Sequence, residues 1–411
     1  RGIVIPGMPN VHSHAFQYAM AGTTERGGQG ETFWSWRETM YRFAARIDPE
    51  TLQAVAAQLY AEMLSRGYTA VGEFHYLHHD PAGVPYANPC ELSDRIVAGA
   101  QQAGIALTHL PVLFAYGGFG ETPATQSQRR FVTNLDTYVD LLERLQMRHR
   151  DQPGIKLGMA AHSLRAVSPP LLTEAVTALD RIAPECPIHI HVAEQEREIA
   201  ESEAALGARP VDWLLDNHDL SERWCLIHAA HMSETETRRL ARSGAVAGLC
   251  PTTEANLGDG LFNAAAYLAA DGRIAVGSDS HVTVDPAQEL RWLEYGERLR
   301  QRRRGVLAYG APHVGAALYR AACDGGARAL GWTPAGIAPG GRADLVVLDA
   351  GHPALFDKNE NLVLDAYVFA ATAGAVRDVF VGGRRVVADG RHNHADALLR
   401  DYQKALQKLR D

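Results

Sequence analysis

The feature that most limits how this chain can fold is the alternation of short apolar runs with longer segments of helical periodicity. Eight such runs occur, at residues 2–14, 69–75, 106–114, 155–162, 187–192, 224–228, 245–249 and 273–279. Segments with apolar residues at helical spacing lie between and after them, at 49–66, 91–103, 134–150, 169–183, 194–206, 234–243, 264–270 and 287–300. This alternation is typical of parallel β-α-β units, and eight such units close a barrel. We therefore predict an α/β protein built on a (β/α)8 barrel of the TIM type.

The pattern changes after the barrel. A further helix is predicted at 310–331, and short β-type runs follow at 340–349, 366–371 and 376–387, separated by glycine and charged turns. An amphipathic helix is expected at 395–408. We predict two domains, a barrel over residues 1–333 and a small β-sandwich-like domain with a terminal helix over 334–411. These late strands alone would leave an unpaired sheet edge, and the chain begins at Arg1 rather than at a methionine, so we expect that N-terminal strands of the small domain are missing.

Composition excludes several classes of protein. No stretch approaches the ~18 consecutive apolar residues of a membrane-spanning helix, and no signal sequence is present, so we expect no membrane association. The five cysteines are widely spaced, without a Cys-x-x-Cys pair, which indicates the reducing cytoplasm. The formal charge is −8, and the one basic run, at residues 300–304, is expected to be a solvated helix end. Nucleic acid is therefore not an expected partner.

The 18 histidines gather at the predicted strand ends, where a barrel carries its reactive groups. His12 and His14 end the first strand, and period-two alternation turns both toward the same face. His191 ends the fifth strand, and Asp279 ends the eighth. A single His-x-His pair is weak, but four such residues at three strand ends of one barrel predict a metal site. Three imidazoles and a carboxylate without thiolates favour Zn²⁺.

At this point the chain resembles the amidohydrolase superfamily, in particular its deaminase branch. The resemblance runs through PGMPNVHSH, HVAE, the strand-six histidine, GSDS and GGRADLVVLD, and it covers essentially the whole chain. Members with two metals usually bridge them with a carboxylated lysine at the end of strand four. Here Lys156 lies at the start of that strand and His162 at its end. The resemblance therefore implies one zinc ion per subunit.

Three residues are the expected catalytic groups. Zinc lowers the pKa of a bound water from ~15.7 to about 7, and Glu194 is placed to take the proton and deliver it to a departing nitrogen. His228 would hydrogen-bond the hydroxide, and Asp279 could both bind the metal and accept a proton. Glu194 could instead be only the N-terminal acid of the next helix. Two other histidines are nearby: we expect His231 to be a loop residue and His189 a deeper core residue.

Five residues are the expected substrate contacts. Arg165, just past strand four, could grip a carboxylate with two hydrogen bonds, and Arg37 lies on the loop after strand one. Gln17 follows a metal ligand by three residues, and Tyr76 and His162 follow strands two and four. Arginines around the metal pocket of an acidic protein suggest a small anionic substrate. Trp34 and Trp36 are expected to pack rather than bind, and His78 and His79 to orient their loop or face solvent.

The strings HSHAFQ, WSWRE, EFHYLHHD, AAHSLRAV and HIHVAEQ are similar to those of one subgroup, the formimidoylglutamate deiminases. That resemblance implies hydrolysis of an anionic amidine, N-formimino-L-glutamate, to N-formyl-L-glutamate and ammonia in histidine degradation, by a homodimer. Two alternatives stay open. One is an aminohydrolase of a purine, pyrimidine or adenosine-type substrate. The other is a non-catalytic barrel scaffold, although scaffolds tend to lose metal ligands.

Overall fold

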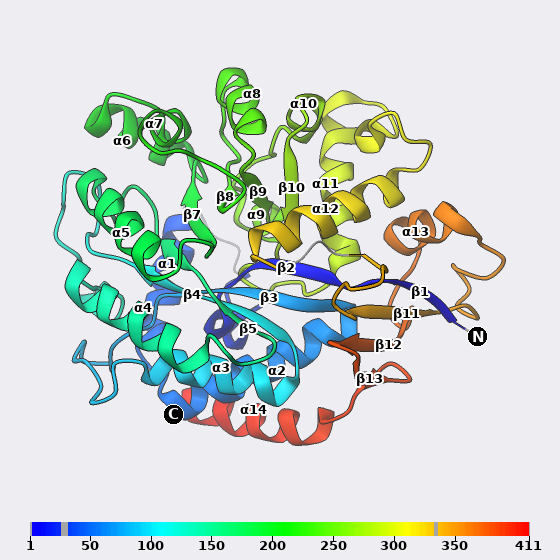
Figure 1. The fold of residues 1–411 in the computed structure, drawn as a ribbon, viewed down its shortest axis with the longest axis horizontal. Helices are drawn as coiled ribbons and strands as arrows, with labels where there is room; N and C mark the ends of the chain where they lie inside the picture. Colours follow the sequence, from blue (N-terminus) through cyan, green and yellow to red (C-terminus); the bar gives the residue numbers. More distant parts are fainter. Residues whose placement is uncertain (1, 26–31, 333–335, 411) are drawn as a thin grey trace.

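The computed structural model describes residues 2–25, 32–332 and 336–410, and its main body is a barrel of parallel strands (Figure 1). Eight strand positions follow one another in the order β10-β9-β8-β7-β6-β4-β3-β2, and β5 pairs with β4 beside β6. The strands are β2 (Met8–Ser13), β3 (Tyr68–His75), β4 (Ala106–Leu113), β5 (Ile155–Leu157), β6 (Met159–Ala161), β7 (Ile188–Val192), β8 (Trp224–His228), β9 (Val246–Leu249) and β10 (Arg273–Val276). The predicted barrel is confirmed: each predicted run coincides with one barrel strand, except 155–162, which holds both β5 and β6.

The barrel closes at the residues that the sequence singles out as metal ligands. β2 and β10 are its first and last strands, and a parallel bridge joins Ser13 to Asp279. The backbone N–H of Asp279 donates to the carbonyl of His12 at 3.0 Å, and the N–H of His14 donates to the carbonyl of Asp279 at 3.3 Å. These hydrogen bonds form a seam at the carboxyl ends of the two strands.

The first predicted strand, residues 2–14, is divided in the structure between two sheets. β1 (Gly2–Pro6) pairs antiparallel with β11 (Leu345–Asp349), whereas β2 belongs to the barrel. The break falls at Gly7, where a Cβ atom would lie 2.2 Å from the side chain of Thr69. Glycine is therefore required for the chain to pass at this point. The sequence did not indicate the break because the run stays apolar on both sides of it.

The second sheet is antiparallel and has the order β1-β11-β12-β13-β14. Its other strands are β12 (Val376–Val381), β13 (Arg384–Ala388) and β14 (Arg391–His392). The predicted β-type run at 366–371 is wrong, because most of it belongs to the helix α13 (Glu360–Phe369). Val363, Ala366 and Tyr367 recur at helical spacing and are buried. A short apolar run does not distinguish a strand from a buried helix.

The division into two domains remains a prediction. The boundary at residues 333–334 lies outside the described residues. The second sheet takes its β1 strand from the range assigned to the barrel, and one continuous hydrophobic core includes both sheets. Val346 and Val379 of the second sheet belong to the same core as Leu64 and Tyr68 beside the barrel.

Helices surround the barrel, and α14 packs along α2 at its outside (Figure 1). The helices that the sequence predicted are α2 (Pro49–Arg66), α3 (Glu91–Ala103), α4 (Leu135–His149), α5 (Pro169–Ile182), α6 (Glu196–Leu206), α8 (Glu234–Ser243), α10 (Ala264–Ala269), α11 (Pro286–Gln301), α12 (Val314–Ala329) and α14 (Ala395–Arg410). Helices that it did not predict are α1 (Phe33–Ala44), α7 (Pro210–Asn217), α9 (Pro251–Leu257) and α13. Within the described ranges, none of these helices is both long and apolar enough to cross a bilayer.

Candidate metal centre and active site

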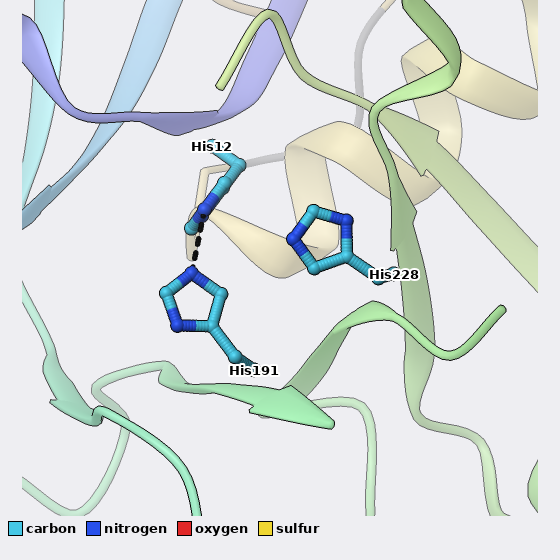
Figure 2. A group of neighbouring side chains, drawn as sticks. All are labelled: His12, His191 and His228. Atoms are coloured by element: carbon cyan, nitrogen blue, oxygen red, sulfur yellow. Dashed lines mark hydrogen bonds between the residues drawn. The ribbon is translucent and has the colours of Figure 1, made fainter. Parts of the chain in front are cut away.

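Side chains from three strand ends converge at the carboxyl end of the barrel. His12 and His14 come from β2 and its end, His191 from β7, and Asp279 from the turn after β10. The Nε2 atoms of His12 and His191 face each other at 2.9 Å (Figure 2). Oδ1 of Asp279 lies 3.4 Å from Nε2 of His12 and 3.3 Å from Nε2 of His14. The structure therefore brings the four predicted metal ligands together.

The rings of His14 and His191 are oriented by hydrogen bonds on their far side. Nδ1 of His14 donates to the carbonyl of Phe74 at 2.9 Å, and Nδ1 of His191 donates to the carbonyl of His162 at 3.0 Å. Each of these hydrogen bonds leaves the Nε2 lone pair directed at the space between the four predicted ligands, as metal binding by histidine requires. Burial lowers the pKa of His12, His14 and His191 below the usual value, so the rings are neutral. Neutral imidazole is the form that binds a metal.

The donor set fits a zinc ion. His12, His14 and Asp279 offer ligand atoms within 4.8 Å of one another, and so do His12, His191 and His228. Nitrogen and carboxylate donors without a thiolate suit Zn²⁺. Lys156 takes no part, because its Nζ donates to the carbonyl of Gly331 at 2.5 Å, at the opposite end of its strand.

A carboxylate clamps the strand that carries the two histidines, and the sequence analysis missed it. Glu73 on β3 is buried, and its Oε2 accepts from the hydroxyl of Ser13 at 2.6 Å and from Tyr60 at 3.0 Å. Its Oε1 accepts from the backbone N–H of Ala15 at 2.7 Å. Burial raises the pKa of Glu73 to about 7. Ser13 and Ala15 flank His14, so Glu73 fixes the backbone that positions this ring.

The side chains of Glu194 and His228 face each other beside the four predicted metal ligands. Nε2 of His228 lies 3.7 Å from Oε1 of Glu194 and 3.9 Å from Oδ2 of Asp279. Burial raises the pKa of Glu194 to about 7. Burial alone would lower the pKa of His228, but the carboxylates of Glu194, Glu254 and Asp279 raise it to about 10. The pair combines a buried carboxyl group that can exchange a proton near neutral pH with an imidazole that lies among three carboxylates.

The position of Glu194 does not match the alternative in which it serves only as a helix-terminal acid. Helix α6 begins at Glu196 with Gln195 as its N-cap, and the acidic residues of its first turn are Glu196 and Glu198. The carboxylate of Glu198 accepts the backbone N–H groups of Ala193 and Glu194, each at 3.1 Å. These bonds fix the turn before the helix, and the Glu194 side chain lines the cavity described below.

The backbone turns sharply at three of these strand ends. Ala193, His228 and Asp279 have φ values of 53°, 70° and 45°, in the left-handed region that residues other than glycine rarely adopt. Each of them lies at or next to a residue of the centre. Such conformations cost free energy and persist where the surrounding structure holds them in place.

One cavity opens onto the centre, with about 530 Å³ not occupied by protein atoms. It brings together every predicted catalytic and substrate residue and all predicted metal ligands except His12, which lies beneath them. The lining residues are His14, Gln17, Phe33, Trp36, Arg37, Met40, Tyr41, Tyr76, Phe114, Phe131, His162, Arg165, His191, Glu194, His228, Leu257 and Asp279.

Two arginines of the cavity lack a carboxylate partner among the described residues. The Nε atoms of Arg37 and Arg165 are buried without a hydrogen-bond acceptor in that part of the chain. Burial, followed by the repulsion of Arg165, lowers the pKa of Arg37. Both guanidinium groups approach the ring of Trp34, with Cζ atoms 4.5 Å and 5.7 Å from its centroid. Trp34, which we expected to pack rather than bind, packs against the two arginines, whereas Trp36, for which we expected the same, lines the cavity.

The other predicted substrate residues lie around the same space. Nε2 of Gln17 donates to Oη of Tyr76 at 2.9 Å, while Oε1 of Gln17 is buried without a donor among the described residues. Nδ1 of His162 lies 3.0 Å from the hydroxyl of Ser163. Burial, and after it the charge of Arg165, lowers the pKa of His162 well below the usual value. The cavity therefore combines cationic, neutral polar and aromatic groups.

Four other histidines lie outside the centre, as the sequence suggested. Nε2 of His189 donates to the carbonyl of Ala329 at 2.7 Å, and Nε2 of His231 donates to the carbonyl of Asp259 at 2.6 Å. His78 and His79 hold their loop through hydrogen bonds to backbone carbonyls, each at 2.8 Å.

Comparison with known proteins agrees with this architecture. The model of the family described as "Amidohydrolase family" matches residues 3–386. A curated formimidoylglutamate deiminase from Pseudomonas aeruginosa is 50% identical over 412 aligned residues, covering 100% of this chain and 90% of the relative.

Solved structures show the same fold. A crystal structure described as an amidohydrolase from Brucella melitensis superimposes with a TM-score of 0.94 at 49% identity, covering 99% of this chain and 90% of the other. An adenosine deaminase from Xanthomonas campestris, solved with bound zinc, has a TM-score of 0.83 at 23% identity, covering 100% and 86% of the two chains. This last likeness shows the fold alone.

Proposed function

This chain belongs to the amidohydrolase family, and we propose that it hydrolyses the C=NH group of N-formimino-L-glutamate, giving N-formyl-L-glutamate and ammonia. The family and its deiminase relative identify the chain as a hydrolase of C–N bonds. The observation that carries the choice of substrate is the pair of arginines, Arg37 and Arg165, which share the cavity with the metal-binding cluster. A glutamate-derived substrate brings two carboxylates, which such guanidinium groups bind with paired hydrogen bonds.

The substrate would lie with its carboxylates toward the arginines and its amidine carbon toward the cluster. Gln17, Tyr76 and His162 line the space between these ends, and the unpartnered Oε1 of Gln17 offers an acceptor to an N–H group of the substrate. Aromatic side chains, among them Phe33, Tyr41 and Phe131, form part of the cavity wall.

His12, His14, His191 and Asp279 would hold one zinc ion. When bound there, zinc lowers the pKa of water so that hydroxide is available at neutral pH. Glu194 accepts the proton of the attacking water and delivers it to the departing nitrogen. The ring of His228 hydrogen-bonds the oxygen on which negative charge develops. The departing ammonia needs both protons of the water: Glu194 transfers the first, and Asp279 accepts the second from the oxygen as the C–N bond breaks and passes it on.

An ammonia-release assay on a small panel of substrates tests the proposal. We expect ammonia from formiminoglutamate and none from guanine, cytosine or adenosine derivatives. Ammonia from a nucleobase but not from formiminoglutamate would favour the purine, pyrimidine or adenosine-type alternative. No ammonia from any of them, with zinc bound, would favour a scaffold without catalysis. The unpaired arginines argue against nucleobase readout, which uses aromatic stacking and amide groups.

Three finer features belong to the same proposal. We propose one zinc ion per subunit, a homodimer, and a role in histidine degradation in the cytoplasm. Metal analysis of the purified protein tests the first, with one equivalent of zinc expected. Light scattering tests the second, and accumulation of formiminoglutamate in cells that lack the protein tests the third.

A further inference from the structure

Glu254 is a buried carboxylate that the proposed reaction leaves without a role. It belongs to α9, the short helix that follows β9, and its side chain does not line the cavity. Its Oε1 accepts the backbone N–H of Cys250 at 2.8 Å and lies 3.3 Å from Nδ1 of His228. Only 4% of Glu254 is exposed. A carboxylate buried to this degree needs such partners, and one of them belongs to the proposed active site.

His228 therefore lies between carboxylates on both edges of its ring. Nδ1 faces Glu254, whereas Nε2 faces Glu194 at 3.7 Å and Asp279 at 3.9 Å. Figure 2 shows the ring of His228 beside those of His12 and His191. An imidazole that donates Nδ1–H to a fixed acceptor has a single orientation, with Nε2 presented to whatever lies on the other side. This is the arrangement in which one group orients a catalytic histidine from behind.

We propose that Glu254 is a positioning residue that sets the orientation of His228, so that Nε2–H faces the reacting oxygen. The inference rests on the proposed function for the chemistry that His228 performs. The left-handed φ of His228, 70°, describes its backbone and does not by itself fix the rotation of the ring. The hydrogen bond to Glu254 supplies that restriction.

Glu254 is itself held rigidly. The helix begins at Pro251, and the Cys250 N–H that Glu254 accepts lies at its start. Helix α11 also holds the start of α9: its Glu289 accepts the backbone N–H of Thr252 at 3.0 Å and the hydroxyl of Thr252 at 2.6 Å. Thr253 bonds to Ser280, next to Asp279, with 3.0 Å between the two hydroxyls. The start of α9 is thus tied to the turn that carries a predicted ligand.

The kinetic test replaces Glu254 in the zinc-loaded enzyme with formiminoglutamate as substrate. We expect Glu254→Ala to lower kcat by about tenfold to a hundredfold, with zinc content and KM close to those of the wild type. Glu254→Gln keeps an oxygen that can accept Nδ1–H, so it should restore most of kcat. Should the alanine variant fail to fold, the same pattern is sought between Glu254→Gln and Glu254→Leu.

A double-mutant cycle separates positioning from general loss of structure. If Glu254 acts through His228, then Glu254→Ala in a His228→Gln background should lower the residual kcat no further. Glu294→Gln is the matched control, because Glu294 is also buried and accepts backbone N–H groups, those of Val306 and Leu307, without touching His228 or α9. It should lower thermal stability and leave kcat unchanged. Full additivity in the cycle, or an equal loss of kcat in the control, would overturn the proposal.

A spectroscopic readout keeps this test separate from the choice of substrate. In zinc-loaded protein with ¹⁵N-labelled histidine, the Nδ1–H of His228 should give a resolved, slowly exchanging proton signal that disappears in Glu254→Ala. Its presence with no ammonia from formiminoglutamate would leave the positioning intact and reject the substrate. Its absence from the wild type would reject the positioning, whatever the substrate.

Discussion

At the scale of single residues, Arg165 is the clearest case of a group that the folded chain leaves unsatisfied. It is 8% exposed, and its Nε has no acceptor among the described residues. An arginine buried in this way gains most from a ligand carboxylate. Removing it should therefore affect binding more than catalysis.

We predict that Arg165→Ala raises KM for formiminoglutamate by about one to three orders of magnitude, because a buried charge pair contributes about 2–5 kcal/mol. Steady-state ammonia release measures the change. Arg197→Ala is the control, because Arg197 also approaches Trp34, at 4.5 Å, but already pairs with Glu201 at 2.6 Å. An unchanged KM for the Arg165 variant would remove this residue from the substrate site.

Glu194 gives the second prediction at this scale. Glu194→Gln keeps the shape of the side chain and removes its ability to carry a proton, so kcat should fall by about two to four orders of magnitude while zinc remains bound. Metal analysis and kcat on the same preparation make the measurement. Full activity of a zinc-loaded variant would mean that another group moves the proton.

Sequence reasoning could identify Glu194 and the four clustered residues because strand ends of a barrel meet at one face, whatever their separation along the chain. It could not identify Glu73 or Glu254. Both act through hydrogen bonds to residues from other strands or helices, and nothing in their local spacing sets them apart from other acidic residues.

At the scale of secondary structure, the strands and longer helices follow from periodicity, whereas the short elements do not. In the segment that forms α1, aromatic residues alternate with polar ones, and this pattern did not indicate a helix. Yet Trp36, Arg37 and Met40 of this helix line the cavity. The division of strand four at Gly158 was also hidden. A Cβ there would lie 2.6 Å from the carbonyl of Pro187, the residue just before the neighbouring strand β7.

The start of α2 gives a prediction about stability and pH. Asp48 is its N-cap and accepts the N–H of Thr51 at 2.8 Å, and the carboxylate also pairs with Lys408 of α14. Burial by itself raises the pKa of Asp48, but the hydrogen bonds from Lys408 and Thr51 outweigh it and lower the pKa below the usual value. This stabilisation is therefore present above pH about 4 and is lost as the pH falls through the folded-state pKa.

We predict that Asp48→Ala lowers the free energy of unfolding by about 1 kcal/mol at pH 7, and that the difference from the wild type shrinks toward pH 3. Urea titrations at the two pH values measure it. Asp48→Asn keeps a side-chain acceptor for the helix but not the charge, so it should retain most of the stability and lose the pH dependence. A difference that grows as the solution becomes acidic would contradict the assignment.

At the scale of the whole molecule, the barrel and the metal cluster depend on each other. Removing the metal with a chelator should abolish ammonia release and lower the midpoint of thermal unfolding, since a ligand at a thousand times its Kd stabilises the folded state by about 4 kcal/mol. Added zinc should restore both. His14→Ala should be inactive and show little response to the chelator, and a wild type that keeps its activity and midpoint after chelation would refute a bound metal.

The seam between β2 and β10 has a consequence for the order of events during synthesis. His12 and His14 are synthesised before the later barrel strands, but their backbone partner, Asp279, follows only after the intervening strands and helices. A nascent chain that ends before Asp279 can complete neither the closed barrel nor the set of four predicted metal ligands. The proposed metal site is thus assembled only in a late step, when the last strand docks against the first.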